Sequence, residues 1–149
     1  MTYTVHERQV ERRRVATIRE TIPMSMIGED LSAGFGEIVE ASEAASETLQ
    51  GTPFAVYYEV GTNEVDVELG FPVTGEVNSG RVHTTTMEAR RVASTLHVGP
   101  YDEVGPAYEA LTRWIEEHDH TVAGPPCEIY LNDPTTGDEP RTEVQLPFV

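Results

Sequence analysis

One acidic residue in a short apolar stretch is the feature of this sequence that could do chemistry. The run Cys-Glu-Ile-Tyr-Leu lies between a Gly-Pro-Pro turn and an Asn-Asp-Pro turn, which predicts a strand. Alternate side chains of a strand face opposite ways, so Glu128 and Tyr130 share one face. The other face carries Cys127, Ile129 and Leu131 and should pack on a core. Because burying an unpaired charge is costly, we expect Glu128 to form the floor of a ligand cleft.

Glu128 could serve a ligand in two ways. Its carboxylate could pair with a cationic compound, or it could hold a water molecule. Neighbouring rings would desolvate the carboxyl and raise its pKa, which suits a general base. The alternative interpretation is an exposed strand glutamate with no role in a site.

Aromatic residues elsewhere in the chain are candidates for the walls of the same cleft. Tyr57 and Tyr130 could stack on flat ligands and make cation–π contacts. Tyr101 lies in a turn before a helix, where its phenol could contact the ligand or act as a catalytic proton donor. Trp114 and Phe71 complete the candidate ligand-binding set. Each of these rings could instead pack in a core.

Composition limits the classes to which the protein can belong. Its 149 residues suit a single domain over 1–149, and a lone cysteine excludes an intrachain disulfide. Apolar runs are too short to span a membrane, and the N-terminus has no signal-peptide pattern, so we expect a cytoplasmic protein. The net charge is −16 and all ten basic residues are arginine, so we expect no nucleic-acid binding.

The acidity has two explanations. It could be an adaptation to a salty cytoplasm, where screening weakens the repulsion between like charges. It could instead attract cationic ligands. Acidic residues are spread along the chain and do not form one cluster, which favours the adaptation.

Motifs for metals and cofactors are missing from the sequence. His118-Asp119-His120 lies in a polar segment after a helix, and we expect no metal there. The chain has no phosphate-binding glycine loop, nucleotide fingerprint or Ser-His-Asp spacing, so we expect no cofactor.

The chain is a tandem repeat. Three pairs of segments match in order, at offsets of 77, 73 and 77 residues: Val5–Thr17 with Val82–Ser94, Gly51–Tyr57 with Gly124–Tyr130, and Val67–Phe71 with Val144–Phe148. Ordered matches with insertions only at loops indicate a duplication. Repeat one covers about residues 3–74 and repeat two about 81–149, joined at Gly75–Gly80. Ala55 is the partner of Glu128, so the repeats differ where the carboxyl stands.

Each repeat reads as strand, helix, strand, strand. The expected elements of repeat one are a strand over Val5–Arg19 with a bend at Glu11-Arg12, a helix over Ile27–Gln50, and strands over Thr52–Val60 and Glu64–Val73. Those of repeat two are a strand over Arg81–His97, a helix capped by Asp102, and a hairpin of Cys127–Asn132 with Thr142–Phe148. Helical spacing gives that helix an apolar stripe of Val104, Ala107, Tyr108, Leu111 and Ile115. We therefore predict an α+β fold: a duplicated βαββ repeat with pseudo-twofold symmetry, whose mostly antiparallel sheets flank a central ligand groove.

Several motifs resemble the GyrI-like small-molecule-binding family. They are His97-Val98-Gly99-Pro100-Tyr101-Asp102-Glu103, Ala107-Tyr108-Glu109-Ala110-Leu111 and Pro126-Cys127-Glu128-Ile129-Tyr130-Leu131-Asn132-Asp133-Pro134. The resemblance covers essentially the whole chain. It implies a cleft between the repeats that takes up hydrophobic, often cationic or aromatic compounds, with Glu128 inside it. The family also supplies the effector-binding domains of multidrug-responsive transcription regulators. Those regulators carry a helix-turn-helix ahead of this domain, for which the chain has no residues, so we expect no direct contact with DNA.

Three functions are implied by the resemblance. The first is a stand-alone protein that binds small molecules and sequesters toxins or drugs. The second is a hydrolase that opens strained, cyclopropane-containing toxins, using Glu128 and a tyrosine such as Tyr101. The third is an inhibitory protein that has gyrase or a regulator as its partner. The residues leave the natural ligand and the oligomeric state open, and also whether Thr135-Thr136-Gly137 closes the groove.

Overall fold

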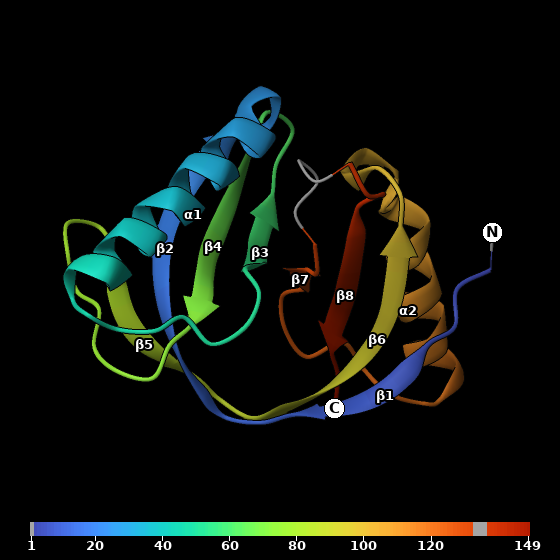
Figure 1. Cartoon of the computed structure of the whole chain (residues 1–149). Helices are drawn as coiled ribbons and strands as arrows, with labels where there is room; N and C mark the ends of the chain where they lie inside the picture. The colour runs from blue at the N-terminus through green and yellow to red at the C-terminus, as the bar shows by residue number, and fades with distance from the viewer. Residues whose placement is uncertain (1, 133–136) are drawn as a thin grey trace. The chain divides into compact units, whose positions relative to one another are not determined.

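The computed structural model describes residues 2–132 and 137–149, and the chain forms two compact units. Unit 1 contains the N-terminal residues up to Glu11 together with Ala89–Val149, and unit 2 contains Arg12–Glu88. Each unit is an antiparallel sheet with one helix packed on it, which confirms the α+β fold class (Figure 1). Thr135 and Thr136, from the segment that could close a groove, lie outside the described residues.

Unit 2 is a four-stranded sheet with helix α1 on one face. The strand order is β5-β2-β4-β3, and the pairings are antiparallel. Its elements are β2 (Arg13–Pro23), the 3-10 helix η1 (Met24–Met26), α1 (Ile27–Ala44), β3 (Phe54–Val60), β4 (Glu64–Pro72) and β5 (His83–Met87). α1 packs closely on β4, because a Cβ at Gly34 would come within 2.6 Å of the side chain of Leu69.

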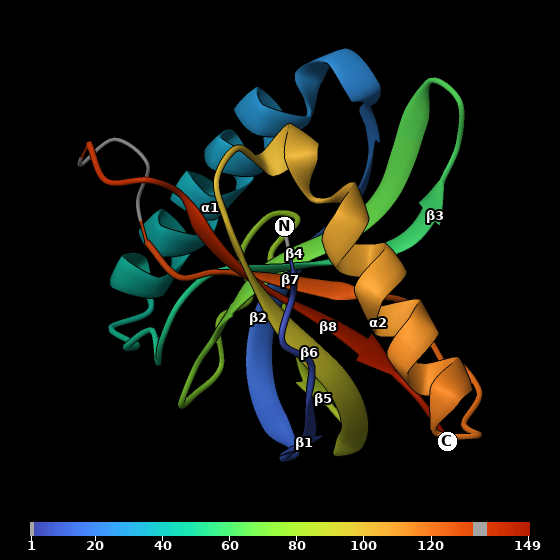
Figure 2. The ribbon, with the colours of Figure 1, turned by 90° about the vertical axis from the view of Figure 1, so that its right-hand side faces the viewer.

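Unit 1 repeats this arrangement. Its strand order is β1-β6-β8-β7, and α2 packs on β6 and β8 (Figure 2). Its elements are β1 (His6–Val10), β6 (Arg90–Val98), the 3-10 helix η2 (Tyr101–Glu103), α2 (Gly105–Glu117), β7 (Cys127–Tyr130) and β8 (Arg141–Pro147). The core beneath α2 is a cluster of buried apolar side chains: Ala93, Ala107, Leu111, Ile115, Val144, Leu146 and Phe148.

Each unit takes one edge strand from the other repeat. β1 comes from repeat one but pairs with β6 in unit 1, where Val10 lies opposite Arg90. β5 comes from repeat two but pairs with β2 in unit 2. The expected strand over Val5–Arg19 is therefore two strands. The predicted bend at Glu11-Arg12 is the place where the chain passes from one unit to the other.

The pairing register corrects one of the sequence matches. Ala16 lies opposite Phe71, and its counterpart Ala93 lies opposite Leu146. The structural counterpart of Phe71 is therefore Leu146, whereas the sequence match assigned it to Phe148. The error is two residues, which keeps each side chain on the same face of its strand. Sequence identity between short segments does not reveal this two-residue shift, because only the hydrogen bonds between strands define which residues lie opposite each other.

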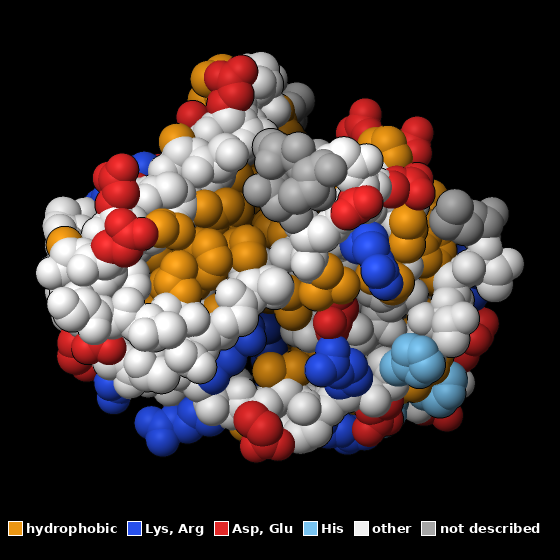
Figure 3. Space-filling view, in the orientation of Figure 1, with side chains coloured by type: hydrophobic (Ala, Val, Ile, Leu, Met, Phe, Trp, Pro, Cys, Tyr) orange, Lys and Arg blue, Asp and Glu red, His pale blue; other side chains and the backbone are white. Residues whose placement is uncertain are grey.

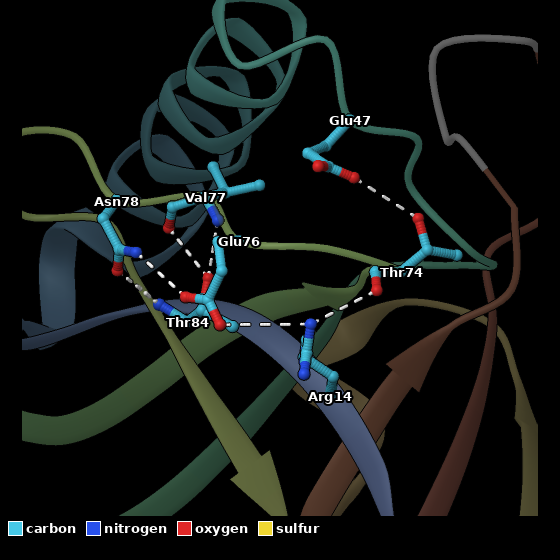
Figure 4. Close-up of polar contacts among 7 residues, drawn as sticks. All are labelled: Arg14, Glu47, Thr74, Glu76, Val77, Asn78 and Thr84. Carbon is cyan, nitrogen blue, oxygen red and sulfur yellow. Dashed lines mark hydrogen bonds and ion pairs between the residues drawn. The ribbon is translucent and has the colours of Figure 1, made fainter.

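The segment between the repeats, Gly75–Gly80, is held within unit 2 (Figure 4). Val77 is fully buried, and its backbone N–H donates to the hydroxyl of Thr84 at 2.7 Å. The same hydroxyl donates back to the Val77 carbonyl at 3.0 Å. The Thr84 N–H donates to the side-chain oxygen of Asn78 at 3.1 Å. The segment expected to join the repeats is thus hydrogen-bonded to strand β5. The chain passes from one unit to the other after Glu11 and after Glu88.

Two helix boundaries differ from their predicted positions. α1 ends at Ala44, six residues before Gln50, and Ser46 after it has a left-handed backbone with φ of 58°. Asp102 was expected to cap the second helix, but it lies inside η2. α2 begins at Gly105 without a side-chain cap. Neither helix within residues 2–132 and 137–149 is long and apolar enough to cross a membrane.

Acidic side chains are scattered over the face of the molecule shown in Figure 3. The chain has 26 Asp and Glu residues against ten arginines, so the carboxylates greatly outnumber the guanidinium groups. Ion pairs such as Arg12 with Glu88 and Arg91 with Glu7 lie at the surface, where they contribute little. Repulsion between like charges therefore opposes the compact state.

Gly70 on β4 supplies a test of the packing in unit 2. A Cβ there would lie 2.5 Å from the Ala16 carbonyl oxygen and 2.7 Å from Cγ2 of Thr17. Gly70→Ala should lower the free energy of unfolding by about 1–3 kcal/mol, as overpacking does, measured by chemical denaturation. Gly36→Ala is the control, because it lies on the exposed side of α1 with no atom within 4 Å. It should stabilise the protein by about 0.5–1 kcal/mol. Equal effects of the two substitutions would contradict the packing.

Salt should stabilise the protein. Raising KCl from about 0.1 to about 1 M shortens the screening length from roughly 10 to 3 Å, which weakens repulsion among the unpaired carboxylates. We expect Tm in thermal unfolding to rise by about 5 °C or more. Sucrose at matched osmolality controls for general exclusion from the surface. A Tm that rises equally in sucrose would show that charge is not the cause.

Candidate functional site

The face of β7 that carries Glu128 is the face covered by α2. Glu128 lies opposite Val144, which belongs to the apolar core beneath that helix. Cys127 lies opposite Gln145 on the other face and is fully buried, as expected. Leu131 was expected beside it, but β7 ends at Tyr130 and Leu131 is 39% exposed. The carboxyl therefore projects into the helix-side layer of unit 1.

Two phenols hold the carboxyl of Glu128. The hydroxyl of Tyr108, on α2, donates to Oε2 at 2.5 Å. The hydroxyl of Tyr130, two residues along β7, donates to Oε1 at 3.2 Å. Glu128 is 8% exposed, and none of the ion pairs formed by residues 2–132 and 137–149 includes it. The site is a buried acid whose partners, where the structure describes them, are neutral hydroxyls.

Burial raises the pKa of the Glu128 carboxyl above its ordinary value. The hydrogen bonds from Tyr108 and Tyr130 favour the charged form and oppose part of this shift, and a positive charge on the His97 ring would act in the same direction. Desolvation is the larger effect because the side chain lies in an apolar layer. A carboxyl in this state gains much from an arriving cation, because the cation would favour the charged form and offset the cost of burial.

Tyr101 lies at the edge of the same site. It begins η2, and its ring meets the ring of Tyr130 edge to face, with centroids 5.6 Å apart and planes at 86°. It is 39% exposed, whereas Tyr130 and Tyr108 are partly buried. The structure thus brings together Glu128, Tyr130 and Tyr101 from the predicted set.

Tyr108 is a residue of the site that the sequence interpretation missed. Its position in the helical repeat assigned it to the apolar stripe of the second helix. The ring does pack against the core cluster, but its hydroxyl reaches Glu128. A tyrosine on a stripe that faces a predicted buried acid is the signal that could have found it.

The other predicted residues belong to the far part of α2 and to unit 2. Trp114 is on α2 and stacks on His118, with ring centroids 4.1 Å apart, and it meets Phe148 edge-on. Tyr57 is on β3 of unit 2, and Phe71 is on β4 of the same unit. Phe71 packs edge-on against a ring of α1. Unit 1 by itself therefore unites three of the six predicted residues.

Unit 2 shows what the same scaffold looks like without the acid. Ala55 lies opposite Leu69 on β4, as Glu128 lies opposite Val144 on β8, so the two residues are structural counterparts. Ala55 is fully buried. The residue 77 positions before Tyr108 is Leu31, which is also buried. The fold therefore does not require an acid or a phenol at these positions.

The arrangement offers acid–base and binding chemistry. The described residues contain no cluster of three or more His, Cys, Asp or Glu side chains that could hold a metal ion. A carboxyl beside two phenols could hold a cation or accept a proton from a bound water.

Comparisons with known proteins place the chain in context. The sequence profile of the GyrI-like small molecule binding domain matches residues 3–149. A search of curated protein sequences gives no significant match.

Among solved structures, the EcmrR C-terminal domain superposes with a TM-score of 0.87 at 24% identity, covering 100% of this chain and 99% of that one. EcmrR bound to DNA gives 0.86 at 24% identity, covering 98% of this chain, which spans 57% of the EcmrR chain. SAV2435 bound to tetraphenylphosphonium gives 0.58 at 17% identity, covering 100% and 94%. At these identities the likeness shows the fold.

The raised pKa of Glu128 predicts how stability depends on pH. Between the ordinary glutamate pKa of about 4.3 and the raised pKa, the folded protein binds a proton that the unfolded chain has lost. The free energy of unfolding contributed by this group is therefore fully present below the ordinary pKa and is lost as pH rises through the raised one. Glu128→Gln stays neutral and should escape this loss.

We expect the Tm of Glu128→Gln to match that of the parent protein near pH 4. At about pH 8 it should be higher by roughly 2–4 °C, the shift that about 1 kcal/mol produces in a chain of this size. Glu109→Gln, which changes an exposed glutamate of α2, is the control and should show no such trend. A Tm difference for Glu128→Gln that is constant between these pH values would rule out the raised pKa.

Proposed function

The chain belongs to the GyrI-like small-molecule-binding family, and on that basis we propose that it binds hydrophobic organic cations at Glu128. The single observation that carries the proposal is a carboxyl buried beneath α2 with phenols as its described partners. A buried charge without a counter-charge is costly, and a cationic ligand would supply the missing one.

The rings around Glu128 suit the apolar part of such a ligand. Tyr130 and Tyr101 present an edge-to-face pair beside the carboxyl, and aromatic faces attract cations as well as apolar groups. Organic cations with delocalised charge lose little on leaving water, so a desolvated carboxylate favours them over strongly hydrated ions. The SAV2435 structure, solved with tetraphenylphosphonium, supports this class of ligand.

The proposed role is sequestration or sensing of such compounds in the cytoplasm. The likeness to EcmrR supports sensing through a regulator partner, since this chain corresponds to 57% of the EcmrR chain seen with DNA. Acidic composition supports the proposal in a second way, because a net charge of −16 raises the local concentration of cations around the protein.

A second candidate function is hydrolysis of electrophilic compounds. The observation that favours it is the short contact between Tyr108 and Glu128, which could work as an acid–base pair. Glu128 would accept a proton from water as the water oxygen bonds to the electrophilic carbon. A tyrosine hydroxyl, of Tyr108 or Tyr101, would protonate the departing carbon of a strained ring. Mass spectrometry of the compound after incubation distinguishes this from binding, by a gain of one water.

Titration with tetraphenylphosphonium tests the binding proposal, with neutral triphenylphosphine oxide as the matched uncharged compound. Glu128→Gln should weaken the cation roughly tenfold to a hundredfold, the value of a desolvated charged contact, and leave the neutral compound unchanged. The control Glu109→Gln removes the same charge from an exposed site and should leave both affinities unchanged.

The affinity of the parent protein for the cation should also depend on pH. It should fall as pH is lowered through the raised pKa of Glu128, because protonation removes the negative charge that would pair with the cation. Glu128→Gln should show a flat profile. Equal binding of the cation by the parent protein and Glu128→Gln at pH 8 would refute the assignment.

A further inference from the structure

His97 is a buried histidine at the end of β6 whose two ring nitrogens are both engaged. It is 3% exposed. Nε2 lies 2.9 Å from the carbonyl oxygen of Pro100, and Nδ1 lies 2.8 Å from the hydroxyl of Tyr3. A carbonyl can only accept, so Nε2 carries a proton and donates. Nδ1 of the neutral ring then accepts from Tyr3, which gives a chain of two hydrogen bonds that run in one direction.

The carbonyl at the end of this chain organises the turn before α2. The Pro100 oxygen also accepts the backbone N–H of Glu103 at 3.1 Å, which closes η2. Both of its lone pairs are therefore used. The first residue of η2 is Tyr101, the ring that meets Tyr130 at the ligand site.

A glycine makes this geometry possible. Gly99 has a φ of +134°, in the range that side chains rarely allow, and its N–H donates to the Pro140 carbonyl at 2.8 Å. The backbone can therefore reverse within three residues, so that the Pro100 carbonyl returns to the imidazole of His97.

Unit 2 shows that the fold does not need a histidine here. The residue 77 positions before His97 is Glu20, whose carboxylate pairs with Arg81. The turn of η1 is held by a backbone bond from Met24 to Asn63 at 2.8 Å. Only in unit 1, which has the buried acid, is a side chain of the preceding strand described as bonding to this turn.

The N-terminal segment fixes the other end of the hydrogen-bond chain. Thr95 donates its hydroxyl to the carbonyl of Thr4 at 2.8 Å. Tyr3 and Val5 pack against the core cluster beneath α2. The phenol of Tyr3 is therefore held by packing on one side and by the backbone of its neighbour on the other.

We propose that His97 is a positioning residue for the ligand site. The bond from His97 to Pro100 fixes the turn that holds Tyr101 beside Tyr130, and through the turn it sets the affinity for hydrophobic cations. The inference about affinity rests on the proposed function, whereas the inference about the turn stands on the geometry alone.

Two substitutions of His97 separate its two bonds. In His97→Gln the amide N–H lies near the position of Nε2 and can still donate to Pro100. In His97→Asn the shorter amide lies near the position of Nδ1, so it can keep the bond to Tyr3 but loses the turn. Thr95→Val is the matched control, because it loosens the N-terminal segment without touching His97.

Hydrogen exchange of the peptide over residues 99–104, measured without ligand, reads out the turn. We expect His97→Asn to speed exchange of the Glu103 amide about fivefold to tenfold, and His97→Gln and Thr95→Val to stay within twofold of the parent protein. The affinity for tetraphenylphosphonium should fall by about threefold to tenfold in His97→Asn and by less than twofold in the other two.

The outcomes separate this inference from the proposed function. Equal effects of His97→Gln and His97→Asn, or no effect of either on exchange, would overturn the positioning role, because a packing role does not distinguish the two amides. If the parent protein fails to bind tetraphenylphosphonium, the proposed ligand class is wrong, and the exchange data alone decide whether His97 positions the turn. Faster exchange in His97→Asn with unchanged affinity would overturn the link to binding.

Discussion

The burial of one carboxyl without a described cation is the constraint on which unit 1 depends. Glu128 enters the layer beneath α2 because the pairing of β7 with β8 puts it on that face. Once there, it needs donors, and the helix and the strand each supply a phenol. These bonds and a raised pKa make the burial tolerable, but they leave the acid short of a full partner. Among the described residues, the lack of a cation beside the buried carboxyl thus lowers the stability of unit 1 and also favours a cationic ligand.

The duplication separates what the scaffold requires from what the site adds. Both units build the same four-stranded sheet, the same short 3-10 turn and the same covering helix. In unit 2 the positions equivalent to Glu128 and Tyr108 hold Ala55 and Leu31, and the layer is an ordinary apolar core. The acid, the phenol and the histidine that supports the turn are therefore additions to a fold that is complete without them.

The sequence predicted the fold class, and it singled out Glu128 for physical reasons. Glu128 could be found because a carboxylate is rare in a short apolar strand and because its repeat partner, Ala55, is apolar. That match survives in the structure since both residues lie in hairpins of the same register.

The hydroxyl contact of Tyr108, the strand register and the crossing of the edge strands could not be predicted from one amino-acid sequence. Tyr108 has an apolar ring and a polar tip, so helical spacing assigns the ring correctly and says nothing of the hydroxyl. The structural counterpart of Phe71 lies two residues from its sequence match, and only the hydrogen bonds between strands reveal this. The crossing of β1 and β5 between units depends on which partner each edge strand finds.

That crossing has a consequence for how the asymmetry of the site could arise. A single repeat has no edge strand of its own kind to complete its sheet, because β1 pairs in one unit and β5 in the other. An ancestral chain with one repeat would have had to exchange strands with a second copy, as a swapped homodimer. In a homodimer every substitution appears twice, so a buried acid would be placed in both halves at double the cost. Fusion into one gene frees each half to change alone, and an acid in one half opposite an alanine in the other is a difference that two identical chains cannot carry.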